Sequence, residues 1–72
     1  MKEQVYVEYP VTLVAESAAA FLLELPELTP KQLWYPKSQI SSDSLEMLEG
    51  QPAGFECEVE FTEWILTEKG LI

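Results

Sequence analysis

The feature that most constrains the fold is the stretch 55–61, where apolar and acidic residues alternate without interruption. Successive side chains of a β-strand point to opposite faces. A strand here would place Phe55, Cys57, Val59 and Phe61 on one face and Glu56, Glu58 and Glu60 on the other. A helix would distribute the glutamates around its circumference and leave no apolar stripe. The stretch therefore predicts a half-buried strand with one apolar face and one row of carboxylates.

Four further runs suit strands that could cover this apolar face. They are residues 5–9, which end or bend at Pro10, residues 11–16, residues 19–25 and residues 31–35. The run 16–25 has the composition of a helix as well, but Pro26 ends it and its neighbours are strands, which favours a strand. Two prolines in 26–30 predict a hairpin loop before 31–35.

Two segments have helical character. Residues 41–50 predict either a short helical turn or a mobile loop, with Asp43 and Glu46 as a capping pair and Gly50 as a stop. Near the C-terminus, Thr62 is a candidate N-cap for a helix over 64–69, and Gly70 suits its C-terminal end. A helix of this length is not stable alone, so Trp64 is expected to dock on the sheet together with Ile65 or Leu66.

A chain of 72 residues is expected to form one domain, residues 1–72. Hydrophobic residues make up 47% of it, which is enough for a core. The predicted fold is mainly β: a small antiparallel sheet or an open SH3-like or OB-like barrel with a short C-terminal helix. The predicted core comprises Val5, Val7, Val11, Leu13, Phe21, Leu23, Trp34, Ile40, Phe55, Cys57, Val59, Phe61, Trp64 and Ile65.

Charge limits the partners that such a domain can bind. There are 13 acidic residues, four lysines, no arginine and no histidine, so the formal net charge is −9. This charge repels phosphate backbones and anionic membranes and favours basic proteins. Direct nucleic-acid binding and membrane binding are therefore not expected. The single cysteine, Cys57, can form no intramolecular disulfide, and no signal peptide is recognisable, so a cytoplasmic location is expected.

The chain offers little for catalysis. Glu56, Glu58 and Glu60 could share a hard cation, but a solvated strand face is the more common role of such a row, and no metal site is expected. Acid–base chemistry would need a buried carboxyl with a raised pKa, and a chain without histidine lacks a histidine base for nucleophilic chemistry. Neither catalytic residues nor a cofactor is predicted. Trp34 and Tyr35 beside Lys37 could stack on bases, but Trp34 in the core and Lys37 at its rim is the preferred interpretation.

Two segments carry a resemblance to a known group. Residues 33–40, Leu-Trp-Tyr-Pro-Lys-Ser-Gln-Ile, and residues 61–72 are similar to segments of small phage and prophage proteins, and the run 19–25 also fits that group. The resemblance implies a small β-domain encoded by a mobile element. It implies no established activity.

Two functions remain open from sequence alone. The first is a non-enzymatic phage-type inhibitor, for example an anti-CRISPR protein. It would bind a basic, nucleic-acid-binding protein or nucleoprotein complex in the host cytoplasm. Its contact would be an acidic surface made of Glu56, Glu58, Glu60, Asp43, Glu46 and Glu49, in which alternate carboxylates imitate the spacing of phosphates. The second is an accessory module of a phage complex, or a homodimer, that pairs through an apolar surface of Leu45, Met47, Leu48, Leu71 and Ile72.

Overall fold

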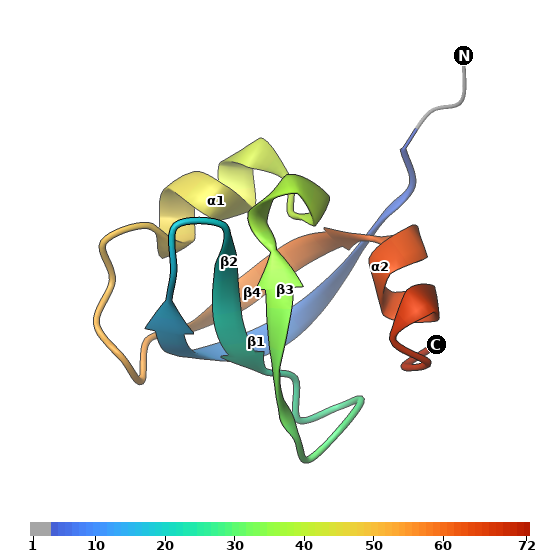
Figure 1. Ribbon diagram of the computed structural model, residues 1–72, viewed down its shortest axis with the longest axis horizontal. Helices are drawn as coiled ribbons and strands as arrows, with labels where there is room; N and C mark the ends of the chain where they lie inside the picture. The colour runs from blue at the N-terminus through green and yellow to red at the C-terminus, as the bar shows by residue number, and fades with distance from the viewer. Residues whose placement is uncertain (1–3) are drawn as a thin grey trace.

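The computed structural model describes residues 4–72, which form a four-stranded antiparallel sheet and three short helical segments (Figure 1). The strands are β1 (Tyr6–Glu16), β2 (Ala20–Glu24), β3 (Gln32–Pro36) and β4 (Glu56–Thr62). The helical segments are the 3₁₀ helix η1 (Lys37–Gln39), α1 (Ser42–Leu48) and α2 (Glu63–Glu68). The prediction of a mainly β domain with an antiparallel sheet and a short C-terminal helix is confirmed.

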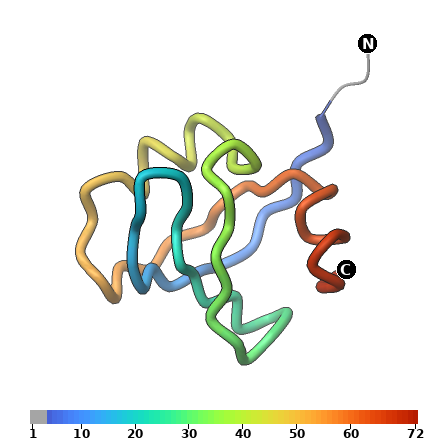
Figure 2. Tube along the Cα trace, viewed as in Figure 1, coloured from blue at the N-terminus to red at the C-terminus, as the bar shows by residue number. Residues whose placement is uncertain are grey.

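The sheet has the order β3-β2-β1-β4 and bends around its apolar face. Although β3 and β4 are opposite edge strands, the ring centroids of Tyr35 on β3 and Phe61 on β4 lie 5.1 Å apart. After β3, the chain passes over the strands through η1 and α1 and returns in a loop to β4 (Figure 2). On this path Ile40 forms an isolated antiparallel bridge with Phe61. The result is a strongly curled, open sheet.

The first strand is longer than predicted, because it continues through Pro10. In the β1–β4 ladder, Leu13 hydrogen bonds with Phe55, so the odd-numbered residues of β1 exchange hydrogen bonds with β4. The nitrogen of Pro10 therefore faces away from β4. The pairing with β2 begins only at Thr12, so the missing N–H of Pro10 removes no ladder bond. A β-bulge lies further along the strand, between Leu13 and Ala15.

The core lies inside the curl of the sheet. It contains Val11, Leu13, Phe21, Leu23, Leu25, Tyr35, Ile40, Leu48, Val59, Phe61, Ile65 and Leu66. Most of the predicted strand residues are among these, and Val7, Phe55 and Cys57 are half-buried against them. The placement of Val5, Trp34 and Trp64 in the core was wrong, since they are 55%, 46% and 57% exposed. Trp34 pairs with Leu22 on the outer face of the sheet, and it is its neighbour Tyr35 that points inward.

Both short helices are held by side-chain caps. The hydroxyl of Ser41 accepts a hydrogen bond from the Ser44 N–H, so the N-cap of α1 is Ser41 and the predicted pair of Asp43 and Glu46 is wrong. Thr62 caps α2 as predicted, by accepting from the Ile65 N–H. Both caps satisfy amides that have no partner within the first helical turn. α2 buries Ile65 and Leu66, whereas Trp64 faces outward.

Candidate acidic binding groove

The acidic row of β4 lies on the outer face of the sheet and extends onto β1. The β1–β4 register places Glu8 opposite Glu60, Pro10 opposite Glu58 and Thr12 opposite Glu56. Directly opposed residues in an antiparallel pair project to the same face. Glu56, Glu58 and Glu60 therefore share one face, as predicted, and Glu8 joins them. A pair of opposed glutamates such as Glu8 and Glu60 is unfavourable for folding, so the sheet concentrates negative charge here at a cost in stability.

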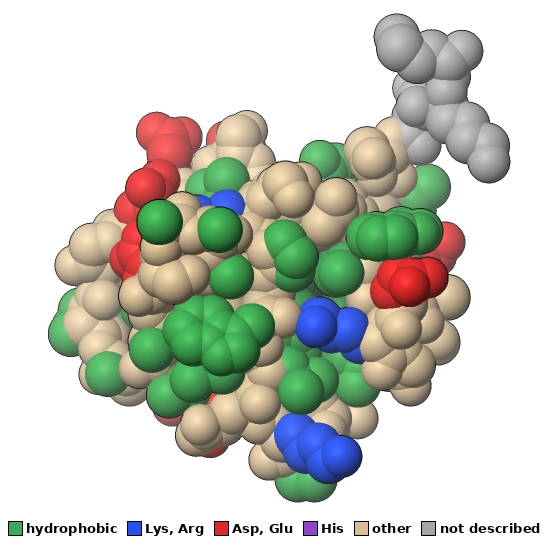
Figure 3. Space-filling view, in the orientation of Figure 1, with side chains coloured by type: hydrophobic (Ala, Val, Ile, Leu, Met, Phe, Trp, Pro, Cys, Tyr) green, Lys and Arg blue, Asp and Glu red, His purple; other side chains and the backbone are tan. Residues whose placement is uncertain are grey.

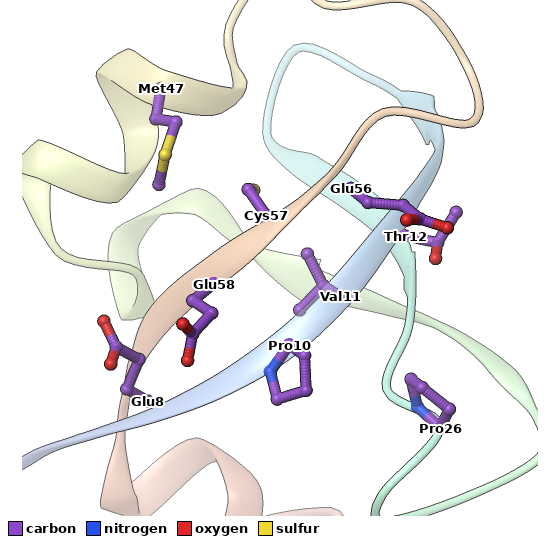
Figure 4. A pocket seen from close by; sticks show the side chains of 9 residues that line it. All are labelled: Glu8, Pro10, Val11, Thr12, Pro26, Met47, Glu56, Cys57 and Glu58. Carbon is purple, nitrogen blue, oxygen red and sulfur yellow. The ribbon is translucent and has the colours of Figure 1, made fainter.

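A shallow groove of about 680 Å³ lies along the paired strands β1 and β4 and includes side chains of this face. Its lining is acidic and apolar, with no basic side chain: Glu8, Pro10, Val11, Thr12, Pro26, Met47, Glu56, Cys57 and Glu58. In Figure 4, the side chains of Glu8 and Glu58 lie beside each other near one end, and Glu56 lies with Thr12 near the other. Met47 of α1 lies on the same side of β4 as Cys57 (Figure 4). The groove lining thus combines separated carboxylates with apolar residues.

Glu60 differs from the other two glutamates of the row. It is half-buried, its Oε1 accepts a hydrogen bond from the Ser41 hydroxyl at 2.9 Å, and its N–H donates to Ser44 Oγ at 2.9 Å. These bonds attach the start of α1 to the end of β4. Glu56 and Glu58 are exposed, so they are the members of the row that can contact a partner freely.

The acidic residues of α1 and its C-terminal end lie outside the groove lining. Asp43, Glu46 and Glu49 are all exposed, while Met47 from the same segment lines the groove. The bonds from Ser41 and Ser44 to Glu60 hold α1 next to the acidic strand. The predicted acidic set is therefore divided: Glu56 and Glu58 line the groove, Glu60 anchors α1, and the other three carboxylates belong to the neighbouring helical segment.

Sequence reasoning missed Glu8 as a member of this surface. The alternation in residues 5–9 does put Glu8 on the face opposite Val7 and Tyr9. What could not be read from the sequence is that β1 pairs with β4. Only this pairing brings Glu8 into the groove with Glu58.

The groove has no nucleophile prepared for catalysis. Burial raises the pKa of the Cys57 thiol, which keeps it protonated at neutral pH and therefore weakly nucleophilic. Within residues 4–72, no group of three or more carboxylate or thiol side chains is arranged to hold a metal ion. The groove lining therefore presents negative charge and apolar surface.

A second surface lies over β3 and α2, where Figure 3 shows hydrophobic side chains with lysines among them. Here Trp34 is exposed, but Tyr35 is fully buried, so the two rings cannot form one platform on which bases could stack. The positive charge of Lys37 is also neutralised, because its ammonium lies 2.7 Å from a carboxylate oxygen of Glu16. The apolar surface predicted to contain Leu45 and Leu48 is not available in full for a partner. Leu48 is fully buried in the core, and Leu45 packs against the core.

No helix in the part of the chain that the structure describes is long and apolar enough to cross a bilayer. Comparison of the chain with protein-family models, with curated proteins and with solved structures gave no match.

Proposed function

We propose that this protein is a non-enzymatic binding protein whose acidic groove occupies a basic, nucleic-acid-binding surface of another protein. The observation that carries the proposal is the gathering of Glu8, Glu56 and Glu58 around one groove without a basic residue in its lining. A surface of this kind attracts a basic partner over a distance and excludes anionic ligands.

The spacing of the carboxylates supports competition with nucleic acid. Glu56 and Glu58 are two residues apart on one strand, so their Cα atoms are separated by roughly 6–7 Å. This is close to the spacing of successive phosphates along an extended strand. Because both residues belong to a sheet, the spacing is fixed before binding and less conformational freedom is lost on association.

The biological setting that fits the resemblance to phage proteins is inhibition of a host complex that handles nucleic acid. A defence complex such as a CRISPR effector has a basic channel of the required kind. The proposed location is the host cytoplasm, where a reduced Cys57 would persist.

Salt-dependent capture from bacterial lysate tests the proposal. Immobilised protein should retain a basic nucleic-acid-binding complex at low ionic strength and release it as salt rises, because exposed charges are screened. The variant Glu56→Lys with Glu58→Lys should retain none of it. The matched control, Glu27→Lys with Glu68→Lys, makes the same change in net charge at two exposed positions outside the groove lining. Equal capture by both variants would reject the acidic groove as the contact.

The exposed Trp34 favours one alternative, an accessory module that self-associates or binds a partner through an apolar surface. Trp34 and Leu22 form a cross-strand pair on the outer face of β2 and β3, and exposed aromatic side chains are enriched in interfaces. In this case capture would resist salt, and Trp34→Gln would abolish it while Glu56→Lys with Glu58→Lys would not.

A further inference from the structure

The outer edge of β4 is only partly occupied. At its end, the Glu60 N–H donates to Ser44 Oγ, and the Glu60 carbonyl accepts from the Ser41 N–H at 3.0 Å. Backbone groups alternate in direction along an antiparallel strand, so the N–H and carbonyl groups of Glu56 and Glu58 also face away from β1. Within residues 4–72, no group hydrogen bonds with these outward atoms. β4 therefore has a free edge at the two residues whose side chains line the groove.

The groove lies along the paired strands β1 and β4 and reaches this free edge at Glu56 and Glu58. Its lining includes Glu56, Cys57 and Glu58 of β4 and, on the far side of the edge, Met47 of α1 (Figure 4). Exposed strand edges readily pair with an extended segment of another chain, and the side chains beside the edge then determine which segment binds.

We propose that β4 accepts an extended basic segment of the partner as an additional strand. This inference rests on the proposed function and states which part of the partner binds and where. In such a strand, two side chains separated by one residue would lie beside Glu58 and Glu56, on the outer face. Opposite charges are favoured at neighbouring cross-strand positions, so these two residues are arginine or lysine. The residue between them would face the side that carries Cys57 and Met47, and is apolar.

Charge complementarity selects this occupant. A second copy of the chain would bring its own Glu56 and Glu58 against the same pair, and like charges at neighbouring positions are unfavourable. A segment with alternating basic and apolar residues matches the carboxylates through one face and the apolar side of the groove through the other. Basic segments of this kind occur in proteins that bind nucleic acid, which connects the inference to the proposed function.

Backbone N-methylation of a synthetic peptide provides the test. The probe is a fluorescent, capped peptide of sequence Gly-Arg-Leu-Arg-Leu-Arg-Gly, in three forms: unmodified, N-methylated at the arginines, and N-methylated at the leucines. All three have the same charge. Because alternate residues of a strand direct their N–H groups to opposite sides, one methylated form blocks the hydrogen bonds to β4 and the other leaves them intact.

Anisotropy titrations at low salt should show a loss of about tenfold or more in affinity for one methylated form, since two or more hydrogen bonds of about 1 kcal/mol each are removed. The other form should bind like the unmodified peptide. Glu56→Gln with Glu58→Gln should weaken binding of the unmodified peptide, whereas the matched control Glu27→Gln with Glu68→Gln should not. Equal affinities for both methylated forms would overturn strand addition and leave charge attraction alone.

The outcomes separate this inference from the proposed function. Capture of a basic complex that depends on Glu56 and Glu58, combined with equal binding of both methylated peptides, contradicts strand addition only. Absence of peptide binding together with absence of capture contradicts both. Sedimentation of the protein alone as a dimer that the peptide does not dissociate would assign the edge to a second copy and overturn the inference.

Discussion

Replacing Tyr35 with phenylalanine should stabilise the domain. The Tyr35 side chain is fully buried between the curled strands, and its hydroxyl has no hydrogen-bond partner among residues 4–72. A buried hydroxyl without a partner costs roughly 1–3 kcal/mol, because it loses its hydrogen bonds to water. Removing one oxygen leaves a void whose cost is only about 0.2–0.3 kcal/mol, at about 24 cal/mol per Å³ for roughly 10 Å³. The ring keeps its contact with Phe61, so the expected gain in the free energy of unfolding is about 1–2 kcal/mol.

The same substitution has a pH signature. Burial raises the pKa of Tyr35 from 10.0 to about 12. Between these values the unfolded phenol loses its proton while the folded one keeps it, so the native chain loses stability as pH rises through this window. The loss is roughly 2–3 kcal/mol for a shift of this size, and Tyr35→Phe should not show it. The advantage of the variant therefore increases between pH 10 and pH 12.

Urea-induced unfolding of both proteins at pH 7 and across pH 10–12, followed by circular dichroism, measures these differences. Tyr6→Phe is the control, because Tyr6 is 44% exposed and its hydroxyl can be hydrated; its effect should be within about 0.5 kcal/mol. A Tyr35→Phe protein that is less stable by 1 kcal/mol or so at pH 7 would mean that the hydroxyl makes a favourable hydrogen bond in solution, which refutes the reasoning.

Three further predictions concern the supports of the groove and the charge of the chain. Ser44→Ala removes the acceptor of the Glu60 N–H and should cost about 1–2 kcal/mol in urea unfolding, while the exposed Ser42→Ala should cost little. Thr62→Val removes the cap of α2 and the 2.7 Å hydrogen bond to the side chain of Gln39, so it should cost about 1–2 kcal/mol by the same measurement. Added sodium chloride should raise the thermal midpoint, because it screens the self-repulsion of a chain with net charge −9; an unchanged or lower midpoint would contradict this.

Strand positions with strict alternation were predictable from sequence. In residues 55–61 the strict alternation of apolar and acidic residues is enough to assign each side chain to one face of a strand. The structure places Val59 and Phe61 in the core and Glu56 and Glu58 at the surface. The helix at residues 63–68 was recognisable from Thr62 and Gly70, since a cap and a stop are local signals.

Errors arose where adjacent residues compete for the interior. Trp34 and Tyr35 are both large and aromatic, and only the strand register decides that Tyr35 faces inward opposite Phe21. Trp64 was expected to dock because so short a helix needs contact with the sheet, but Ile65 and Leu66 make that contact. The acidic strand residues of the groove were predictable, but its other lining residues were not. Glu8 lines the groove only because β1 pairs with β4 over a long distance in the sequence. Met47 lines it only because α1 docks beside the strand.

Competition with nucleic acid tests the central claim most directly. A labelled single-stranded DNA bound to the captured basic partner is titrated with this protein, and displacement is followed by fluorescence anisotropy. The acidic groove predicts that the wild-type chain and the control Glu27→Lys with Glu68→Lys displace the DNA, and that Glu56→Lys with Glu58→Lys does not. Displacement by all three proteins, or simultaneous binding of the wild-type chain and the DNA, would contradict the account.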